Sequence, residues 1–146
     1  MITISHLTKI FEGKGPRVTA LEDVNLEIGK GDIYGIIGMS GAGKSTLLRC
    51  LTLLERPTSG QIMLAGQDIA SLSGAQLRAA RRGMGVVFQG YNLLMQKTVA
   101  ENVAFPLRLE KGYDKAAVQA RVAELLAIVG LEDRAGAYPA QLSGGQ

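Results

Sequence analysis

A glycine-rich segment followed by lysine and serine constrains this chain more than any other feature. Residues 38–46 read Gly-Met-Ser-Gly-Ala-Gly-Lys-Ser-Thr, the G-x-x-x-x-G-K-S pattern whose backbone closes around phosphate groups. The apolar run 33–37 directly before it is typical of a buried strand, and residues 46–51 are typical of a helix. Strand, glycine loop and helix in this order are the context that the pattern requires. An α/β chain that binds the β- and γ-phosphates of a nucleotide is therefore predicted.

Each part of this phosphate loop (residues 38–46) has its own physical role. Glycines allow the backbone angles that turn successive N–H groups inward on an anion, and the helix start adds the positive end of its dipole. Lys44 is expected to place its ammonium between β- and γ-phosphate, and Ser45 to offer its hydroxyl to Mg²⁺. A glycine-rich turn that binds nothing is the alternative, but the strand, the spacing, the lysine and the serine all argue against it. The residues expected to bind nucleotide here are Gly38, Met39, Ser40, Gly41, Ala42, Gly43, Lys44, Ser45 and Thr46.

Composition excludes several other classes of protein. The 146 residues suit one domain or part of one, with 47% apolar residues for a core. A formal charge of +3 with no basic block longer than Arg81–Arg82 argues against nucleic acid as a partner. The single cysteine, Cys50, forms no internal disulfide and is expected to pack inertly in the helix after the loop. No signal peptide or membrane-spanning run is visible, so any action at a membrane would go through a partner.

The first part of the chain is predicted to be rich in strands. Residues 2–10 are expected to form an edge strand, residues 18–28 a second strand, and residues 61–64 a short one. The S-x-x-Q sequence that begins at Ser73 is a capping signal for a helix that ends near Arg82. Residues 84–88 are then expected to form a second buried strand that ends at Gln89.

The character of the sequence changes to helical after Gln89. Residues 98–101 have the form of a capping box, Asp114 is a candidate cap for the next helix, and Gly130 is expected to end that helix. We predict two parts: residues 1–91 as an α/β core part that contains the phosphate loop, and residues 92–146 as a helical subdomain. The residues expected on the buried face of the second helix are Val118, Val122, Leu125, Leu126 and Val129.

Three further features bear on function, although each has an ordinary structural interpretation. Gln89 at a strand end is suited to contact Mg²⁺ or orient a water, but it is equally a plain polar strand end. Residues 142–146 read Leu-Ser-Gly-Gly-Gln, which is either an ordinary loop or a second anion-binding nest before a helix. Phe11, just after the first strand, is a core residue on the simplest interpretation.

Taken together, these motifs resemble the ATP-binding subunits of ABC transporters over the whole length of the chain. That family carries the phosphate loop, a strand-end glutamine, a helical insert and Leu-Ser-Gly-Gly-Gln in this order. The resemblance implies an α/β P-loop NTPase (ABC ATPase) core with an N-terminal antiparallel β subdomain, an inserted helical subdomain and a C-terminal truncation. It also implies that Phe11 stacks on adenine and that Gln89 contacts Mg²⁺ and the membrane subunit, so Gln89 and Lys44 are the catalytic candidates. Residues that would contact the γ-phosphate held by the opposite subunit are Ser143, Gly144 and Gly145.

Several stretches are similar to the methionine importers within that family. These are residues 33–38, 40–50, 53–58, 88–94 and 103–107. The resemblance implies an ATP-hydrolysing subunit with ATP and Mg²⁺ as cofactors, acting as a homodimer on the cytoplasmic face of the bacterial inner membrane. Its implied partners are integral membrane permease subunits and, through the complex, a substrate-binding protein.

Other family features have no counterpart in this sequence. After Gln89 there is no apolar strand that ends in an Asp for Mg²⁺ and a catalytic Glu, and no later switch histidine. The only histidine, His6, lies in or beside the first strand and is expected to be structural. We therefore expect a fragment that ends at the signature segment (residues 142–146). By itself it should be poorly stable, because the 33–37 strand would have an unpaired apolar edge. It should also be nearly inactive, because the strand with the Asp and Glu and the helix that orients the N–H groups of the signature segment have no counterpart.

Two alternatives to a methionine importer stay open at this point. One is an ATPase of another ABC system, such as a polar amino-acid importer or a lipoprotein-release complex. The other is a protein of a different class, either a non-transport ABC protein or a nucleotide-binding module without turnover, and the latter is also a fair description of the fragment itself.

Overall fold

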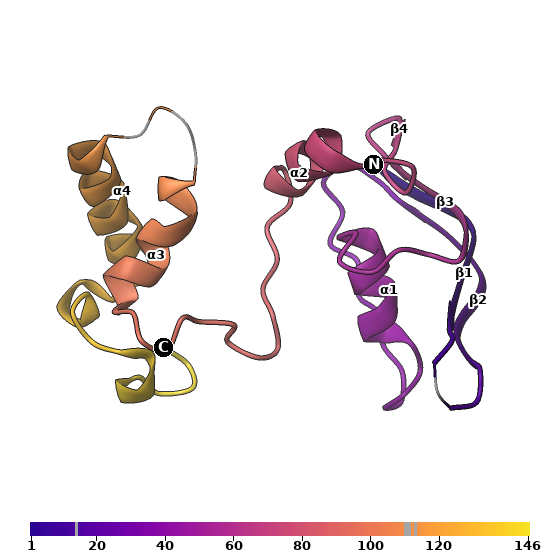
Figure 1. Cartoon of the computed structure of the whole chain (residues 1–146), viewed down its shortest axis with the longest axis horizontal. Coiled ribbons are helices and arrows are strands. Elements are labelled where there is room, and N and C mark those ends of the chain that lie inside the picture. Colours follow the sequence, from indigo (N-terminus) through magenta and orange to yellow (C-terminus); the bar gives the residue numbers. More distant parts are fainter. Residues whose placement is uncertain (14, 110–111, 113) are drawn as a thin grey trace. The chain divides into compact units, whose positions relative to one another are not determined.

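The computed structural model describes residues 1–13, 15–109, 112 and 114–146. The chain divides into two compact units, Met1–Val87 and Phe88–Gln146. Figure 1 shows the elements of each unit along the chain. Within the described ranges, no helix combines the length and the apolar character needed to cross a membrane.

A four-stranded antiparallel sheet forms one side of the first unit. Its strands are β1 (Ile2–Phe11), β2 (Val18–Ile28), β3 (Ser59–Leu64) and β4 (Gln67–Asp68), in the order β2-β1-β3-β4. The three predicted strands at these positions are confirmed. The prediction that the first is an edge strand is wrong, because β1 pairs with β2 on one side and with β3 on the other. A strand's sequence does not say how many neighbours it has.

The described residues of the first unit form a core between the sheet and α1 (Lys44–Leu51). Ile4, Leu7 and Ile62 of the sheet are fully or almost fully buried with Cys50 of α1. Burial raises the pKa of the Cys50 thiol, as expected for a cysteine that packs as a small apolar residue. This packing fixes α1, and with it the phosphate loop at its start, to the sheet.

A second helix, α2 (Gly74–Arg82), also belongs to the first unit. Ser73 is its N-cap, as predicted, and has an extended backbone. The Ser73 side chain makes no capping hydrogen bond, so the capping box expected with Gln76 does not form.

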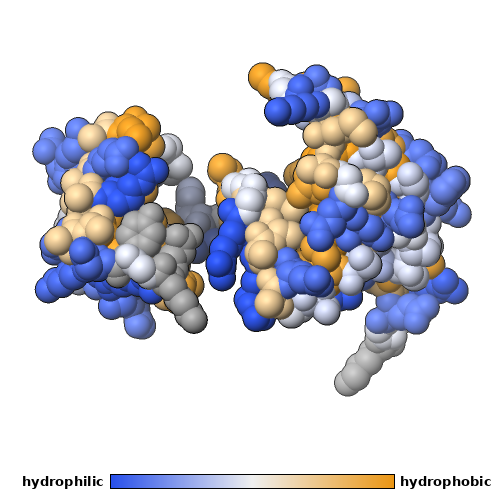
Figure 2. All heavy atoms as spheres, turned by 90° about the horizontal axis from the view of Figure 1, so that it is seen from above, coloured by the Kyte–Doolittle hydropathy of each residue, from blue (hydrophilic) through white to orange (hydrophobic). Residues whose placement is uncertain are grey.

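Two predicted strands are absent. Residues 33–37 and 84–88 have no regular secondary structure, and Ile37 and Val87 are 94% and 100% exposed. Figure 2 shows apolar side chains, drawn in orange, at the surface. Neither segment has a ladder partner among the described residues, and a strand exists only where a neighbour takes up its backbone hydrogen bonds. The prediction of buried strands here is therefore wrong. Apolar residues indicate that a segment favours burial, but they do not show that a partner strand is present to pair with it.

The described residues of the second unit form two helices and two short 3₁₀ helices. They are α3 (Val99–Arg108), α4 (Lys115–Ile128), η1 (Glu132–Arg134) and η2 (Pro139–Gln141). The capping box at Thr98 and the Asp114 cap are both confirmed, the latter by a 2.6 Å bond from Ala117 N to Asp114 Oδ1. Gly130 follows the end of α4 in the left-handed conformation, as predicted.

The core of the second unit lies between α3 and α4. Its buried residues are Val99, Ala104, Val118, Val122 and Leu126. The predicted face of α4 is confirmed for its three buried members, and Leu125 is partly buried. Val129 lies just past the helix and is mostly exposed, so its place on that face is wrong. The cores of the two units share no residue.

Candidate functional site

The phosphate loop leads directly into the N-terminus of α1. Gly43 is the N-cap, with φ 84°, and Leu47 N donates to Gly43 O at 2.8 Å as the helix begins. No side chain caps this terminus, and the first turn carries no acidic residue. The N–H groups of the first turn and the positive end of the helix dipole therefore meet no carboxylate of that turn, an arrangement suited to an anion.

Close contact with β2 explains why position 43 is a glycine. A Cβ there would lie 2.5 Å from Ala20 O and 3.0 Å from the Leu21 side chain, on a backbone with positive φ. Ala20 is the extra residue of a β-bulge, because Lys9 pairs with Leu21 whereas Ile10 pairs with Thr19. The irregular position of the ladder is thus the place where the loop touches the sheet.

Lys44 draws the loop together from the first turn of α1. Its ammonium donates to Gly38 O and to Met39 O, both at 2.7 Å. Ala42 N donates to Met39 O at 3.2 Å, which closes a turn at the tip of the loop. The ammonium therefore lies on the same side of the loop as two of its carbonyl groups, with its charge directed into the loop.

These observations fit a bound phosphate group. Glycine conformations, an uncapped helix start and a lysine converge on one loop, and phosphate oxygens suit all three. Ser45 is exposed in the first turn of α1, and its hydroxyl is the kind of hard oxygen ligand that Mg²⁺ takes. In the described part of the chain, no group of three or more His, Cys, Asp or Glu residues is placed to hold a metal ion. The fit for Mg²⁺ thus rests on Ser45 together with phosphate oxygens.

Phe11 lies at the same end of the first unit as the loop. It is the last residue of β1, pairs with Val18 of β2 and is 40% exposed. Val18 is two residues before Ala20, which touches the loop at Gly43. Its exposure also shows that Phe11 is not an ordinary core residue.

The other predicted site residues belong to the second unit. Gln89 is exposed in a bend at the start of that unit and is not at a strand end, so the premise of the prediction does not hold even though its role stays open. Ser143, Gly144 and Gly145 are exposed in a turn after η2. Ser143 N donates to Gln146 Oε1 at 3.0 Å, which is half of a capping box at the signature segment.

Tyr91 joins the Gln89 segment to the signature segment. A Cβ added at Gly144 would lie 3.2 Å from the Tyr91 hydroxyl oxygen. Both residues belong to the second unit, so two stretches more than 50 positions apart in sequence meet there. No sequence pattern predicts a part for Tyr91 in the site, and nothing in the spacing indicates this contact.

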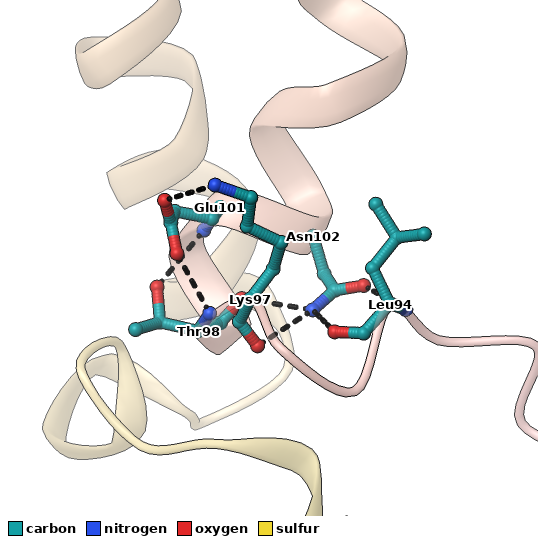
Figure 3. Close-up of polar contacts among 5 residues, drawn as sticks. All are labelled: Leu94, Lys97, Thr98, Glu101 and Asn102. Carbon is teal, nitrogen blue, oxygen red and sulfur yellow. Dashed lines mark hydrogen bonds and ion pairs between the residues drawn. The ribbon is translucent and has the colours of Figure 1, made fainter.

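Asn102 of α3 is a second residue that the sequence analysis missed. Its side chain accepts from Leu94 N at 2.8 Å and donates to the carbonyl oxygens of Leu94, Lys97 and Thr98 (Figure 3). Beside it, Glu101 accepts from Thr98 N at 2.9 Å and from Lys97 Nζ at 3.1 Å. One amide thereby fixes residues 94–98, which follow the Gln89 segment, to the start of α3. The sequence signal for this role is the position of Asn102, one turn after the N-cap residue Thr98.

Comparison with known proteins identifies the family that shares this arrangement. The profile of the ABC transporter family matches residues 21–146, from β2 through the phosphate loop to the signature segment. This chain belongs to the ABC transporter family. The resemblance inferred from the sequence is therefore confirmed.

Individual ABC relatives are similar over the whole chain. It is 54% identical to the methionine import ATP-binding protein MetN of Desulfitobacterium hafniense and 56% identical to that of Symbiobacterium thermophilum, over all 146 residues. Those alignments span 43% and 44% of the two relatives. The chain therefore spans less than half the length of these relatives.

Solved ABC cassettes confirm the predicted fold class. A dimeric, post-hydrolysis structure of the ATP-binding cassette MJ0796 with ADP and phosphate matches the whole chain with a TM-score of 0.90 at 35% identity. A second dimeric structure of that cassette matches with a TM-score of 0.89. Each match covers 65% of the solved chain.

Proposed function

We propose that this chain is the nucleotide-binding part of an ATPase subunit that couples ATP hydrolysis to the import of methionine. The observation that carries the proposal is the identity of 54–56%, over all 146 residues, to proteins described as methionine import ATP-binding proteins. The cargo follows from this similarity alone, because no residue of the phosphate loop recognises an amino acid.

The phosphate loop supplies the binding chemistry in this proposal. The ammonium of Lys44 and the N–H groups at the start of α1 hold β- and γ-phosphate, and the Ser45 hydroxyl is a ligand of Mg²⁺. When bound, Mg²⁺ neutralises charge on the phosphate oxygens. Phe11 stacks on the adenine, which its exposure at the loop end of the sheet supports. Catalysis of this kind is mainly positioning and charge stabilisation.

Two such subunits would work together. We assign residues 1–91 to the ATP-binding core and residues 92–146 to the helical subdomain. Ser143, Gly144 and Gly145 would contact the γ-phosphate bound by the opposite subunit, and Gln89 would contact Mg²⁺ and the membrane subunit. Dimeric structures of a related cassette support the first of these roles. Permease subunits would hold the dimer at the cytoplasmic face of the bacterial inner membrane, with a substrate-binding protein on the complex.

These 146 residues alone are expected to bind ATP without efficient turnover. No apolar strand that ends in Asp-Glu follows Gln89 in this sequence, so no carboxylate is assigned to activate water. Binding and hydrolysis therefore have to be measured separately.

The proposal is tested by the variant Lys44→Met, with a substitution of another lysine of the same unit as its control. We expect this variant to lower the affinity for ATP with Mg²⁺ by about tenfold or more, because a charge-assisted contact to phosphate is lost. Lys30→Met removes a lysine from an exposed turn of the same unit and should leave the affinity unchanged. Isothermal titration calorimetry gives both affinities, and a phosphate-release assay gives the turnover.

One result would contradict the proposal, and another would contradict only the expectation of binding without turnover. Equal ATP affinity in the wild-type chain and the Lys44→Met variant would show that the phosphate loop does not bind the nucleotide in the proposed way. Phosphate release by the wild-type chain well above that of Lys44→Met would overturn the expectation of binding without turnover, and would leave ATP binding intact.

A further inference from the structure

Lys9 lies beneath the aromatic ring assigned to the base. It is two residues before Phe11 in β1, so the two side chains leave the same face of the strand. The ammonium of Lys9 is 4.8 Å from the centre of the Phe11 ring. At this distance a cation is attracted to the electron-rich face of an aromatic ring.

The ammonium is held in place by two further contacts. Lys9 Nζ donates to Glu55 Oε1 at 2.6 Å and to Arg56 O at 2.8 Å, which uses two of its three N–H groups. The Lys9 side chain is only 12% exposed, whereas Phe11 as a whole residue is 40% exposed. The cation is therefore fixed and shielded on the inner side of a ring that solvent still reaches.

The same anchor reaches the helix that carries the phosphate loop. Glu55 follows α1 closely, and its backbone N–H donates to Arg49 O of α1 at 3.0 Å. Lys9 also pairs with Leu21 at the edge of the bulge whose Ala20 touches Gly43. Lys9 thus connects the strand of Phe11 directly with the segment after α1, and through its pairing with Leu21 with the part of β2 that the start of α1 touches.

We propose that Lys9 is a positioning residue for the nucleoside base: its ammonium covers one face of Phe11 and leaves the opposite face for stacking. This inference rests on the proposed binding of ATP. A ring held from one side has less freedom to lose when a base stacks on the other side, so the base binds more tightly. Because Lys9 is also tied to α1, the stacking face is held at a fixed distance from the phosphate loop.

Comparing ATP with inorganic tripolyphosphate, each with Mg²⁺, isolates the contribution of the base. The wild-type chain should bind ATP more tightly than tripolyphosphate, and Phe11→Ala should abolish most of that preference. Lys9→Met should lower the affinity for ATP about three- to tenfold and change that for tripolyphosphate less than about twofold. Lys9→Arg keeps a cation and should restore most of the preference.

Two variants separate this role from that of a structural ion pair. Glu55→Gln keeps an oxygen acceptor for Lys9 and the cation beneath the ring, so it should retain the preference for ATP. Lys9→Met/Glu55→Gln leaves no unpaired carboxylate and should show the same loss as Lys9→Met. Retained binding of tripolyphosphate shows that each variant is folded at the phosphate loop.

Each other outcome has a distinct meaning. If the wild-type chain binds neither ATP nor tripolyphosphate, the proposed ATP binding is overturned, and the inference with it. Equal wild-type affinities for the two ligands overturn the inference together with the stacking role proposed for Phe11, and leave phosphate binding by the loop intact. An unchanged preference in Lys9→Met overturns the inference alone. An equal loss of preference in Glu55→Gln and Lys9→Met, or a loss of tripolyphosphate binding in Lys9→Met, would assign Lys9 a structural role instead.

Discussion

Gly43 is the residue at which the phosphate loop touches the sheet, and the space there excludes any side chain. We expect Gly43→Ala to lower the free energy of unfolding of the first unit by about 2–4 kcal/mol, from backbone strain and from the clash with Ala20 O. The affinity for ATP should fall as well, because the loop has to move. Urea unfolding followed by circular dichroism and an ATP titration measure the two effects.

Gly31→Ala is the matched control for this change. Gly31 has φ 90°, close to the 84° of Gly43, but an added Cβ there would meet nothing within 4 Å. Gly31→Ala should therefore lower the free energy of unfolding by about 1 kcal/mol, from backbone strain alone, and it should bind ATP normally. Equal losses in the two variants would show that the contact with Ala20 has no energetic importance.

At the scale of the element, the start of α3 depends on the charge of Glu101. The pKa of Glu101 lies below its ordinary value, mainly because its carboxylate accepts a hydrogen bond from Thr98 N and also one from Lys97. A folded pKa below the unfolded one contributes stability that is present above about pH 4.5 and is lost as the pH falls through the folded pKa. We therefore expect the melting temperature of the second unit to fall as the pH is lowered below about 4.5.

Glu101→Gln should remove that part of the pH dependence, since its amide oxygen still accepts from Thr98 N but does not titrate. Glu132→Gln, in η1, serves as the control because no capping bond involves its side chain in the described structure. Melting temperatures between pH 3 and pH 7 compare the three proteins. An unchanged acid-side slope in Glu101→Gln would assign the loss to other carboxylates.

Local signals predicted the elements well where the element depends on its own residues. The capping box at Thr98, the cap at Asp114 and the glycine after α4 are all read from neighbours a few positions away. Residues 33–37 and 84–88 were misassigned because a strand depends on a partner strand, and that information is not local. The same reason explains why β1 was taken for an edge strand.

At the scale of the whole molecule, the phosphate loop was predictable because nine consecutive residues specify it. The place of Phe11 beside that loop was not, since it follows from the register of β1 on β2 and from the bulge at Ala20. The contacts of Lys9 with Glu55 and of Tyr91 with Gly144 join residues more than 40 positions apart. Sequence motifs thus supplied the chemistry of the site, and tertiary packing supplied the residues that support it.

Separate cores in the two units predict separate consequences for a core substitution. Leu126 is 3% exposed in the core of the second unit, so Leu126→Ala should cost about 2–5 kcal/mol of stability there. The affinity of the monomeric chain for ATP without Mg²⁺ should not change, because the phosphate loop and Phe11 lie in the first unit, whereas the roles proposed for second-unit residues need Mg²⁺ or an opposite subunit. Ile62→Ala removes a fully buried residue of the first core and should lower both stability and ATP affinity.

Hydrogen exchange read by mass spectrometry locates each loss, and an ATP titration measures its effect on binding. For Leu126→Ala we expect faster exchange in residues 99–108 and 115–128 only, with the protection of α1 and the sheet unchanged. Faster exchange in α1 together with weaker ATP binding would show that the units unfold as one. That result would mean that the phosphate loop depends on the helical unit for its stability, and the two-unit description would fail.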